Sequence, residues 1–529
     1  MSITSTEDAM VTAEQPAQKG HPKGLYVLFA IEMWERFNYY GMRAILLYFM
    51  TQALLFKLDF ASNLYGSYIS LLYLTPLVGG YFADRFWGNK KSIFVGGLVM
   101  AAGELILFIC GTIYNSSPGL ANILFFSGLG FMIAGNGFFK PNISTLVGQL
   151  YPKGDLRVDP AYTIFYMGIN LGAFIGPIAC GTVGNTGSPA DFKWAFLVAG
   201  VGMIISLIVQ RIYHNKYVRD PEGKILGLTP GDLVVDKLNT EASSHIKPPS
   251  PIWSNAVFII IIMLAFAALS IGAIYLDTRI NYLFYLLGAS FLFIIILIFS
   301  DKNLTREEQQ RIWVMVIIAF FVVFFWGAYE QTGASLSVFA DRQTNRHLWG
   351  NYVMPPSYFQ SFNSAFIIIF APILAWAWLK MGKRQPATPT KMGIGLILLS
   401  LGYLWIAYGV KDVSTKQVSM IWLTGLYLLH TLGELCLSPI GLSLFNKLSP
   451  LRFASLLMAV WFTGNAGGNK LAGVLSSLYP EGGKTTNFLG YQMSNLNEFF
   501  MLFVFMGGTA GIILLLLSKR LQKMMHGIQ

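Results

Sequence analysis

Long apolar segments recur along this chain and constrain its fold more than any other feature. Of its 529 residues, 54% are hydrophobic and only 12% are charged, a balance that excludes an ordinary soluble domain. Each segment is long enough to cross about 30 Å of hydrocarbon as a helix. The segments span residues 25–54, 62–87, 92–114, 121–147, 160–184, 193–214, 254–276, 280–300, 312–340, 357–380, 392–411, 419–447, 451–478 and 496–518. We therefore predict an all-α integral membrane protein with fourteen spans, arranged as six, two and six.

The positions of the basic residues predict the orientation of these spans. A net charge of +11 could suggest a nucleic-acid partner, but the lysines and arginines lie in the short loops between the apolar segments. Most of the 37 fall in alternate loops, as the positive-inside rule requires when both termini are cytoplasmic. We expect a multi-pass protein of the plasma (inner) membrane, with the lipid bilayer as a partner and no nucleic acid.

Residues 1–20 and the cysteines give two further expectations. Residues 1–20 are polar and have neither a basic start nor a short apolar core, so no cleavable signal is expected. The three cysteines are too scattered for a disulfide or zinc framework, and no metal site is predicted.

The layout of the spans predicts two bundles. Their boundaries are a cytoplasmic tail at 1–24, an N-terminal six-helix bundle at 25–214, a cytoplasmic linker at 215–253, an inserted helix pair at 254–300, a C-terminal six-helix bundle at 301–522 and a tail at 523–529. Two such bundles suggest pseudo-symmetry, with a site between them near the middle of the membrane. The inserted pair has charges only in its expected turn, at Asp277 and Arg279. It should pack at the edge, away from the site, and be dispensable for the chemistry of that site.

A charged stripe lies within the first apolar segment. On a helix, six side chains share one face: Glu32, Glu35, Arg36, Tyr39, Tyr40 and Arg43. A charge at the bilayer centre costs at least ~2.5–3.5 kcal/mol, so this face must point into a bundle or a cavity. Ion pairs that only fasten helices together are one interpretation. Two carboxylates, two arginines and two tyrosines on one face suit proton and ligand binding better.

Ionisable residues in later segments complete a possible site. Lys140 lies in the fourth segment, and Glu330 and Glu434 lie in the second half of the chain. Asn170 in the fifth segment could bind a ligand or serve equally well as an interhelical hydrogen-bonding group.

Cations on one wall of a cavity and anions on the other fit a zwitterion. Its carboxylate would bind Arg43 and Lys140, and its ammonium would bind Glu434 and Asn363. An anion such as nitrate would leave Glu434 without a partner, and a neutral sugar would use neither wall.

The second segment ends with the sequence Gly79-Gly80-Tyr-Phe-Ala-Asp84-Arg85-Phe-Trp-Gly88-Asn-Lys90-Lys91. This sequence resembles a loop of the major facilitator superfamily. The resemblance implies a major facilitator fold, with Asp84 and Arg85 in a gating role because they can bridge neighbouring helix ends in one conformation only.

Four motifs are spread over both halves of the chain. They are Glu-x-x-Glu-Arg-Phe-x-Tyr-Tyr-Gly from Glu32, Gly-Asn-Gly-Phe-Phe-Lys-Pro-Asn from Gly135, Phe-Tyr-x-x-Ile-Asn-x-Gly from Phe165 and Gly-Glu-Leu-x-Leu-Ser-Pro from Gly433. These motifs resemble the signatures of proton-dependent oligopeptide transporters, and the inserted helix pair resembles that of the bacterial members. The resemblance implies import of di- and tripeptides with protons by alternating access, with the proton gradient as the energy source, no cofactor and a functional monomer. A carrier of another small anion or peptide-like molecule, such as nitrate or a drug, is the alternative.

The resemblance also implies roles for single residues. Proton coupling would involve Glu32, Glu35, Arg36 and Lys140; peptide binding would involve Arg43, Tyr40, Tyr73, Lys140, Asn170, Trp326, Glu330, Asn363, Glu434, Ser438 and Trp461; and Glu330 would pair with Arg43 at the outer gate. A membrane peptidase is disfavoured because the chain has no His-Glu-x-x-His, no Gly-x-Ser-x-Gly and no paired intramembrane aspartates. Two charged residues match no motif: Glu104 has no assigned role, and Lys470 is expected to snorkel to the outer surface.

Overall fold

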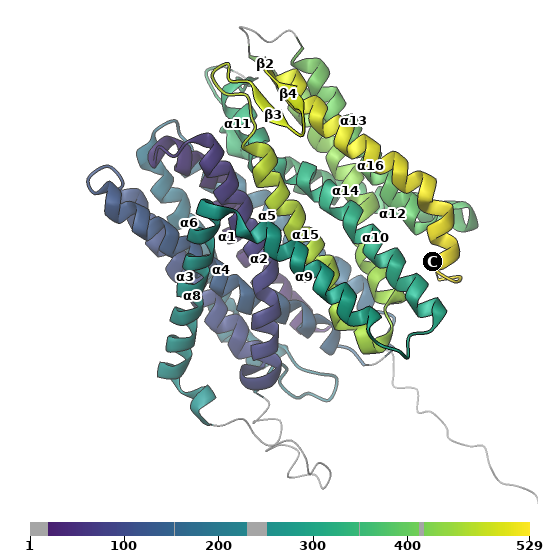
Figure 1. Ribbon diagram of the computed structural model, residues 1–529. Coiled ribbons are helices and arrows are strands. Elements are labelled where there is room, and N and C mark those ends of the chain that lie inside the picture. Colours follow the sequence, from purple (N-terminus) through teal and green to yellow (C-terminus); the bar gives the residue numbers. More distant parts are fainter. Residues whose placement is uncertain (1–19, 153, 230–250, 349, 412–416, 529) are drawn as a thin grey trace, which may run out of the picture.

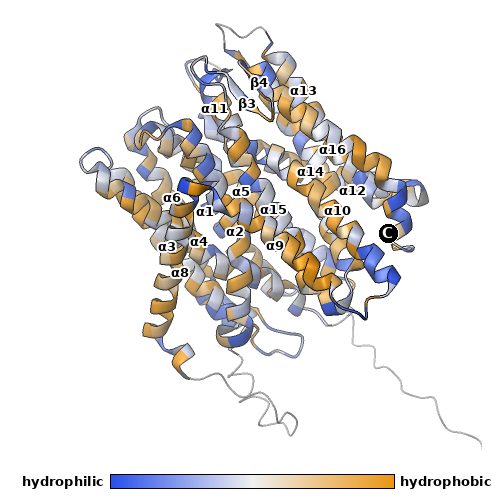
Figure 2. Cartoon of the chain, in the orientation of Figure 1, coloured by the Kyte–Doolittle hydropathy of each residue, from blue (hydrophilic) through white to orange (hydrophobic). Residues whose placement is uncertain are grey.

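The computed structural model describes residues 20–152, 154–229, 251–348, 350–411 and 417–528, which form two bundles of long helices (Figure 1). Most of the predicted tail at 1–24 and residues 230–250 of the predicted linker lie outside the described residues. Hydrophobic residues cover the lengths of the helices, and hydrophilic residues gather at their ends (Figure 2). This pattern is the one expected of helices that lie in a bilayer.

The first bundle is built from six long helices. They are α1 (Lys23–Tyr48) with the π-helical turn η1 (Phe49–Ala53), α2 (Leu58–Phe82) with the π-helical turn η2 (Ala83–Trp87), α3 (Gly88–Ile113), α4 (Pro118–Gln149), α5 (Val158–Gly184) and, after η3 (Pro189–Asp191), α6 (Phe192–Tyr217). Within it α1 packs on α5 and α6, and α4 packs on α2 and α3.

The second bundle begins after the inserted pair. Its elements are α10 (Arg306–Tyr329), η5 (Glu330–Gly333), α11 (Ser335–Arg342), η6 (Pro356–Tyr358), α12 (Phe359–Met381), η7 (Gly382–Arg384), α13 (Thr388–Gly409), α14 (Met420–Leu448), η8 (Leu451–Phe453), α15 (Ala454–Ser476) and α16 (Leu496–Met524). Here α13 packs on α14 and α16, and α10 packs on α15. A capping box starts α10: the Thr305 hydroxyl accepts from the Glu308 amide, and the Glu308 carboxylate accepts from the Thr305 amide.

Short strands mark one end of the molecule. Strand β1 (Thr344–Asn345) pairs in parallel with β2 (Val418–Ser419), and β3 (Thr486–Phe488) pairs with β4 (Tyr491–Met493) in an antiparallel hairpin. We call this end the strand end. The opposite end, where α1 begins and α16 finishes, is the terminal end (Figure 1).

Each of the fourteen predicted spans corresponds to a long helix. Among the described residues, 11 stretches are long and apolar enough to cross a membrane, and in that count α2 and α3 form one stretch. Helices α1 and α15 are not among them because the charges of α1 and the glycines and asparagines of α15 lower their hydropathy. The all-α membrane fold is confirmed, and the number of spans stays a prediction.

The inserted pair lies across the two bundles. After η4 (Pro251–Ser254), α8 (Ala256–Ile280) packs on α2 and α4, and α9 (Tyr282–Phe299) packs on α15 (Figure 1). Helices α2 and α15 also pack directly on each other, as do α5 and α12. The pair therefore covers the seam between α2 and α15.

Two predictions about charges near the pair are wrong. Asp277 does not lie in the connecting turn: it lies in the last turn of α8 and is fully buried. Lys470 does not snorkel to a surface, because it too is fully buried and forms an ion pair with Asp277 at 2.5 Å. The cause is the packing of the inserted pair: α9 covers α15, and the last turn of α8 brings the Asp277 carboxylate to Lys470.

The backbones of α5 and α1 lie in close contact, and the addition of a methyl group at this contact tests its importance. A Cβ on Gly172 would lie 2.2 Å from the carbonyl oxygen of Met33. Gly172→Ala should therefore lower the free energy of unfolding by about 1–3 kcal/mol, measured by thermal unfolding in detergent. Gly272→Ala in α8 is the matched control because nothing lies within 4 Å of that position. An equal melting temperature for the two variants would contradict this packing.

Candidate functional site

The charged stripe of α1 faces the interior of the first bundle, as predicted. Glu32, Glu35 and Arg36 are at most 4% exposed. The Arg36 Nε atom lies 3.0 Å from a carboxylate oxygen of Glu32 and 2.5 Å from one of Glu35. The side chain of Asn136 in α4 also donates to Glu35, at 3.4 Å. Two carboxylates thus share one guanidinium inside the first bundle.

Lys140 lies on α4, the same helix as Asn136. Its ammonium lies 4.4 Å from the centre of the Tyr73 ring, a cation–π contact between α4 and α2. Tyr73 in turn lines the cavity between the bundles. Lys140 therefore contacts a residue of the cavity lining but does not line the cavity itself.

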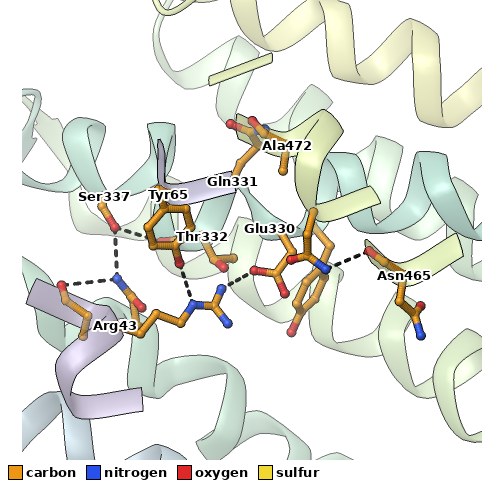
Figure 3. Close-up of polar contacts among 12 residues, drawn as sticks. Arg43, Tyr65, Glu330, Gln331, Thr332, Ser337, Asn465 and Ala472 are labelled. Atoms are coloured by element: carbon orange, nitrogen blue, oxygen red, sulfur yellow. Dashed lines mark hydrogen bonds and ion pairs between the residues drawn. The ribbon is translucent and has the colours of Figure 1, made fainter. Parts of the chain in front are cut away.

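An ion pair joins the two bundles further along α1. The Arg43 guanidinium forms an ion pair with Glu330, and its Nε donates to the Tyr65 hydroxyl at 2.5 Å (Figure 3). Glu330 can reach Arg43 because α10 stops at Tyr329 and the chain turns through η5. Gly333 leaves the necessary space, since a Cβ there would lie 1.7 Å from the Tyr65 hydroxyl.

More cross-bundle contacts lie between this ion pair and the strand end. The Tyr48 hydroxyl donates to the carbonyl of Ser337 at 2.8 Å, and Gln52 donates to Asp341 at 3.0 Å. Where α5 and α12 meet, the Ser361 hydroxyl of α12 donates to the carbonyl of Phe174 in α5 at 2.7 Å. The bundles are therefore joined on the strand-end side of the cavity.

A cavity of about 70 Å³ lies next to the Arg43–Glu330 pair. It is lined by Tyr40, Arg43 and Tyr73 of the first bundle and by Trp326, Tyr329, Glu330, Thr332, Gln360, Asn363, Ser364, Tyr427 and Glu434 of the second. Seven of these were predicted as substrate-binding residues: Arg43, Tyr40, Tyr73, Trp326, Glu330, Asn363 and Glu434. The inserted pair contributes none of the lining, as predicted.

Glu434 brings a carboxylate to this cavity and holds it with neutral donors. The Tyr329 hydroxyl donates to Glu434 Oε2 at 2.5 Å, and the Asn363 amide donates to the same atom at 2.9 Å. The donors come from α10 and α12, and Glu434 comes from α14. Hydrogen bonds from neutral groups hold a carboxylate in place while leaving its charge available to a cation.

Four predicted binding residues lie outside the cavity lining. Lys140 contacts the ring of Tyr73, as described above. Asn170 donates to the Tyr166 carbonyl one turn earlier on α5 at 2.9 Å. Ser438 lies one turn beyond Glu434 on α14, and Trp461 is buried against Phe445 at 5.0 Å between ring centres.

Several lining residues were missed from the sequence. Tyr329 adjoins Glu330, and Gln360 adjoins the predicted Asn363 segment, so both had a signal in a neighbouring motif. Tyr427 had none, because a tyrosine in an apolar segment resembles a core residue until its neighbours are known. The same holds for Tyr65, which does not line the cavity but accepts a hydrogen bond from Arg43.

The predicted gating residues at the terminal end are exposed. Asp84 and Arg85 lie in the π-helical turn η2, and Arg85 lies over the ring of Tyr81 on its own chain segment, 6.0 Å from the ring centre. Their gating role stays a prediction.

The geometry defines a class of protein. Two helix bundles with a polar cavity between them, joined on one side of it by a buried ion pair, have the architecture of a membrane transporter.

Comparisons with known proteins give the family. The model of the POT family matches residues 90–227 and 286–493. An uncharacterized transporter, YclF of Bacillus subtilis, is 35% identical over 100% of both chains, and a di-/tripeptide transporter of Lactococcus lactis subsp. cremoris is 30% identical over 96% of this chain and 98% of that protein. A crystal structure of a peptide transporter POT in complex with sulfate is 33% identical, with a TM-score of 0.77 over 97% of this chain and 98% of that one. The chain belongs to the POT family, which confirms the predicted class of a transporter and not an enzyme.

The Arg43–Glu330 pair should show the energetics of a buried ion pair. Arg43→Gln or Glu330→Gln alone should lower the free energy of unfolding by about 3–5 kcal/mol, because each leaves a buried charge without its partner. The double variant should recover much of that loss. Chemical unfolding of the three variants in detergent measures the coupling.

The exposed pair Arg342–Glu481 is the matched control, since its side chains are 40% and 44% exposed. Its neutralisation should cost less than about 1 kcal/mol. Additive effects of the two buried substitutions would show that the Arg43–Glu330 contact contributes little.

Proposed function

We propose that this protein imports di- and tripeptides together with protons by alternating access. The observation that carries the proposal is the Glu434 carboxylate, which faces the same cavity as Arg43 and is held there by two neutral donors. A peptide has an ammonium at one end and a carboxylate at the other. Glu434 can bind the ammonium, and Arg43 can bind the carboxylate. This assignment agrees with the di-/tripeptide transporter among the relatives of the chain.

Peptide binding involves residues beyond the two charged walls. Tyr40, Tyr73, Trp326 and Asn363 line the cavity and would contact side chains and the backbone of the peptide. Ligand pockets usually measure about 300–1,000 Å³, so a cavity of about 70 Å³ must widen before it can hold a peptide. Widening would bring in Asn170, Ser438 and Trp461, which lie just outside its present lining.

The cross-bundle contacts would form the outer gate. In this proposal the strand end faces outward, the terminal end faces the cytoplasm, and Arg43–Glu330 closes the outer side. Asp84 and Arg85 would gate the cytoplasmic side, where they are exposed in this conformation. The proposed boundaries remain 25–214 and 301–522 for the two bundles, in a monomer of the plasma (inner) membrane.

Glu32, Glu35 and Arg36, with Lys140, would couple protons to this movement. Two carboxylates compete for the Arg36 guanidinium, and Glu35 also accepts from Asn136 on α4, so protonation of Glu35 would weaken the contact between α1 and α4. When Arg43 exchanges Glu330 for the peptide carboxylate, the outer gate loses its ion pair. Peptide and proton binding would thereby act on the same helix, α1.

Replacement of Glu35 tests the proton role. Glu35→Gln should abolish accumulation of a dipeptide driven by a pH gradient and leave peptide exchange across proteoliposome membranes, because the cavity is intact while the proton acceptor is gone. Glu32→Gln should behave in the same way.

The control for this test is Glu104→Gln. Glu104 is fully buried in α3 and accepts from Asn38 at 2.9 Å, and it does not line the cavity. Proton-driven accumulation should survive there. Unchanged accumulation in the Glu32, Glu35 and double variants would refute the proton role.

Chemical masking of the peptide ends tests the two walls. N-acetylation of a dipeptide should weaken its binding more than a hundredfold, since loss of one partner of a desolvated charge pair costs about 3–5 kcal/mol. Glu434→Gln should bind dipeptides poorly and discriminate much less between free and acetylated forms. Arg43 and Lys140 variants should respond in the mirror-image way to C-terminal amidation.

The measurement is competition by free, acetylated, amidated and doubly masked dipeptides on the wild type and the three variants. A full preference for the free amino end in Glu434→Gln would place the ammonium elsewhere. Competition by nitrate but not by any dipeptide would favour a small-anion carrier.

A further inference from the structure

A polar cluster, buried except for the exposed Asn281, joins the inserted pair to both bundles. Lys470 Nζ on α15 lies 2.5 Å from Asp277 Oδ2 on α8, 3.0 Å from the Ser67 hydroxyl on α2 and 3.1 Å from the side-chain oxygen of Asn281. Lys470, Asp277 and Ser67 are fully buried. We call these four residues the seam cluster.

The hydrogen bonds of the seam cluster are complete. The three hydrogens of the Lys470 ammonium have three acceptors. Asp277 Oδ2 also accepts from the Ser67 hydroxyl, and its Oδ1 accepts from the Leu283 amide at the start of α9, at 2.9 Å. A fully satisfied network in a low-dielectric interior is stable as a unit, and removal of one charged member leaves the other charge buried and unpaired.

Close packing of α2 and α15 surrounds the cluster. A Cβ on Gly66 would lie 2.7 Å from the Cα of Gly473, so the two backbones touch here. The Ser476 hydroxyl donates to the Ser62 hydroxyl at 3.1 Å. The cluster therefore depends on the first and second bundles being closed against each other along this seam.

Two short chain segments connect the seam cluster to the Arg43–Glu330 pair. On α2, Ser67 lies two residues from Tyr65, whose hydroxyl accepts from Arg43. On α15, Lys470 lies two residues from Ala472, whose carbonyl accepts from Gln331 at 2.9 Å, and Gln331 follows Glu330 directly (Figure 3). Arg43 is thus linked through Tyr65 to Ser67 on α2, and Glu330 is linked through Gln331 and Ala472 to Lys470 on α15.

We propose that Lys470 and Asp277 are positioning residues of the outer gate. The inserted pair then stabilises the closed outer gate: through the seam cluster it holds α2 and α15 together whenever the strand end is closed. Opening of the strand end separates Ser67 from Lys470 and breaks the cluster. This inference rests on the proposed alternating-access function, because it needs a second conformation in which the strand end is open.

Distance measurements across the strand end test the proposal. Ala190 lies in η3 of the first bundle and Lys484 lies in the loop after α15 of the second, and both are exposed. The three native cysteines are buried. Spin labels on Ala190→Cys and Lys484→Cys therefore report the separation of the bundles by pulsed electron resonance in lipid nanodiscs, without peptide.

Loss of either charge should open the gate. Lys470→Gln and Asp277→Asn should each raise the ratio of open to closed strand ends about tenfold or more, because each leaves a charge without its partner in the closed state. The charge swap Lys470→Asp with Asp277→Lys should return the ratio towards that of the wild type. Ser270→Ala, in α8, is the control: its hydroxyl donates to the Phe266 carbonyl of its own helix, so the ratio should not change.

The neutral double variant Lys470→Gln with Asp277→Asn keeps the test decisive if a single variant fails to fold. It leaves no buried charge in the seam cluster and should still raise the ratio of open to closed strand ends, since the ion pair between Lys470 and Asp277 is gone. Unchanged label distances in this variant, together with a lower melting temperature, would overturn the proposal and show that the pair only fastens the inserted helices. A shift of the label distances in a protein that binds no dipeptide would refute the proposed substrate but support the role of the seam cluster in closing the outer gate.

Discussion

A charge in the interior of a membrane protein needs a partner nearby, because hydrocarbon provides none. This chain meets the requirement in two ways. Arg36 finds Glu32 and Glu35 within one turn of its own helix, so that group moves with α1 as a unit. Arg43 finds its partner on the other bundle. A partner on the same helix is kept in every conformation, whereas a partner across the seam is kept only while the seam is closed.

The distinction divides the site into a local part and a conditional part. In the proposed function, the local part gains and loses a proton without a change in the relation of the bundles. The conditional part, around Arg43 and Glu330, cannot change its pairing without such a change. A proton and a peptide that act on these two parts of α1 would be coupled because one helix carries both.

Sequence reasoning succeeded where a residue's environment is local. The apolar segments predicted the long helices, and the spacing of charges on α1 predicted a stripe that faces inward, since both depend on residues within a few turns. The partner of Arg43 came only from the resemblance to a family, as no periodicity connects residues 43 and 330. Lys470 shows the limit. Its span offers no acidic residue, and Asp277 looks like part of a turn, so neither could be paired before the contact between α9 and α15 was known. Tyr65 and Tyr427 were missed for the same reason.

The distance along the chain between Arg43 and Glu330 has a consequence for biosynthesis. Their separation is 287 residues, and ribosomes add about 5–20 residues per second. The first helix therefore waits roughly 15–60 seconds for the residue that neutralises its arginine. During that interval Arg43 must remain hydrated, at the membrane surface or within the insertion machinery, and α1 cannot settle in the lipid alone. Seating of the first helix is then among the last steps of assembly, and truncation of the chain before α10 would leave a nascent first half that quality-control proteases can recognise.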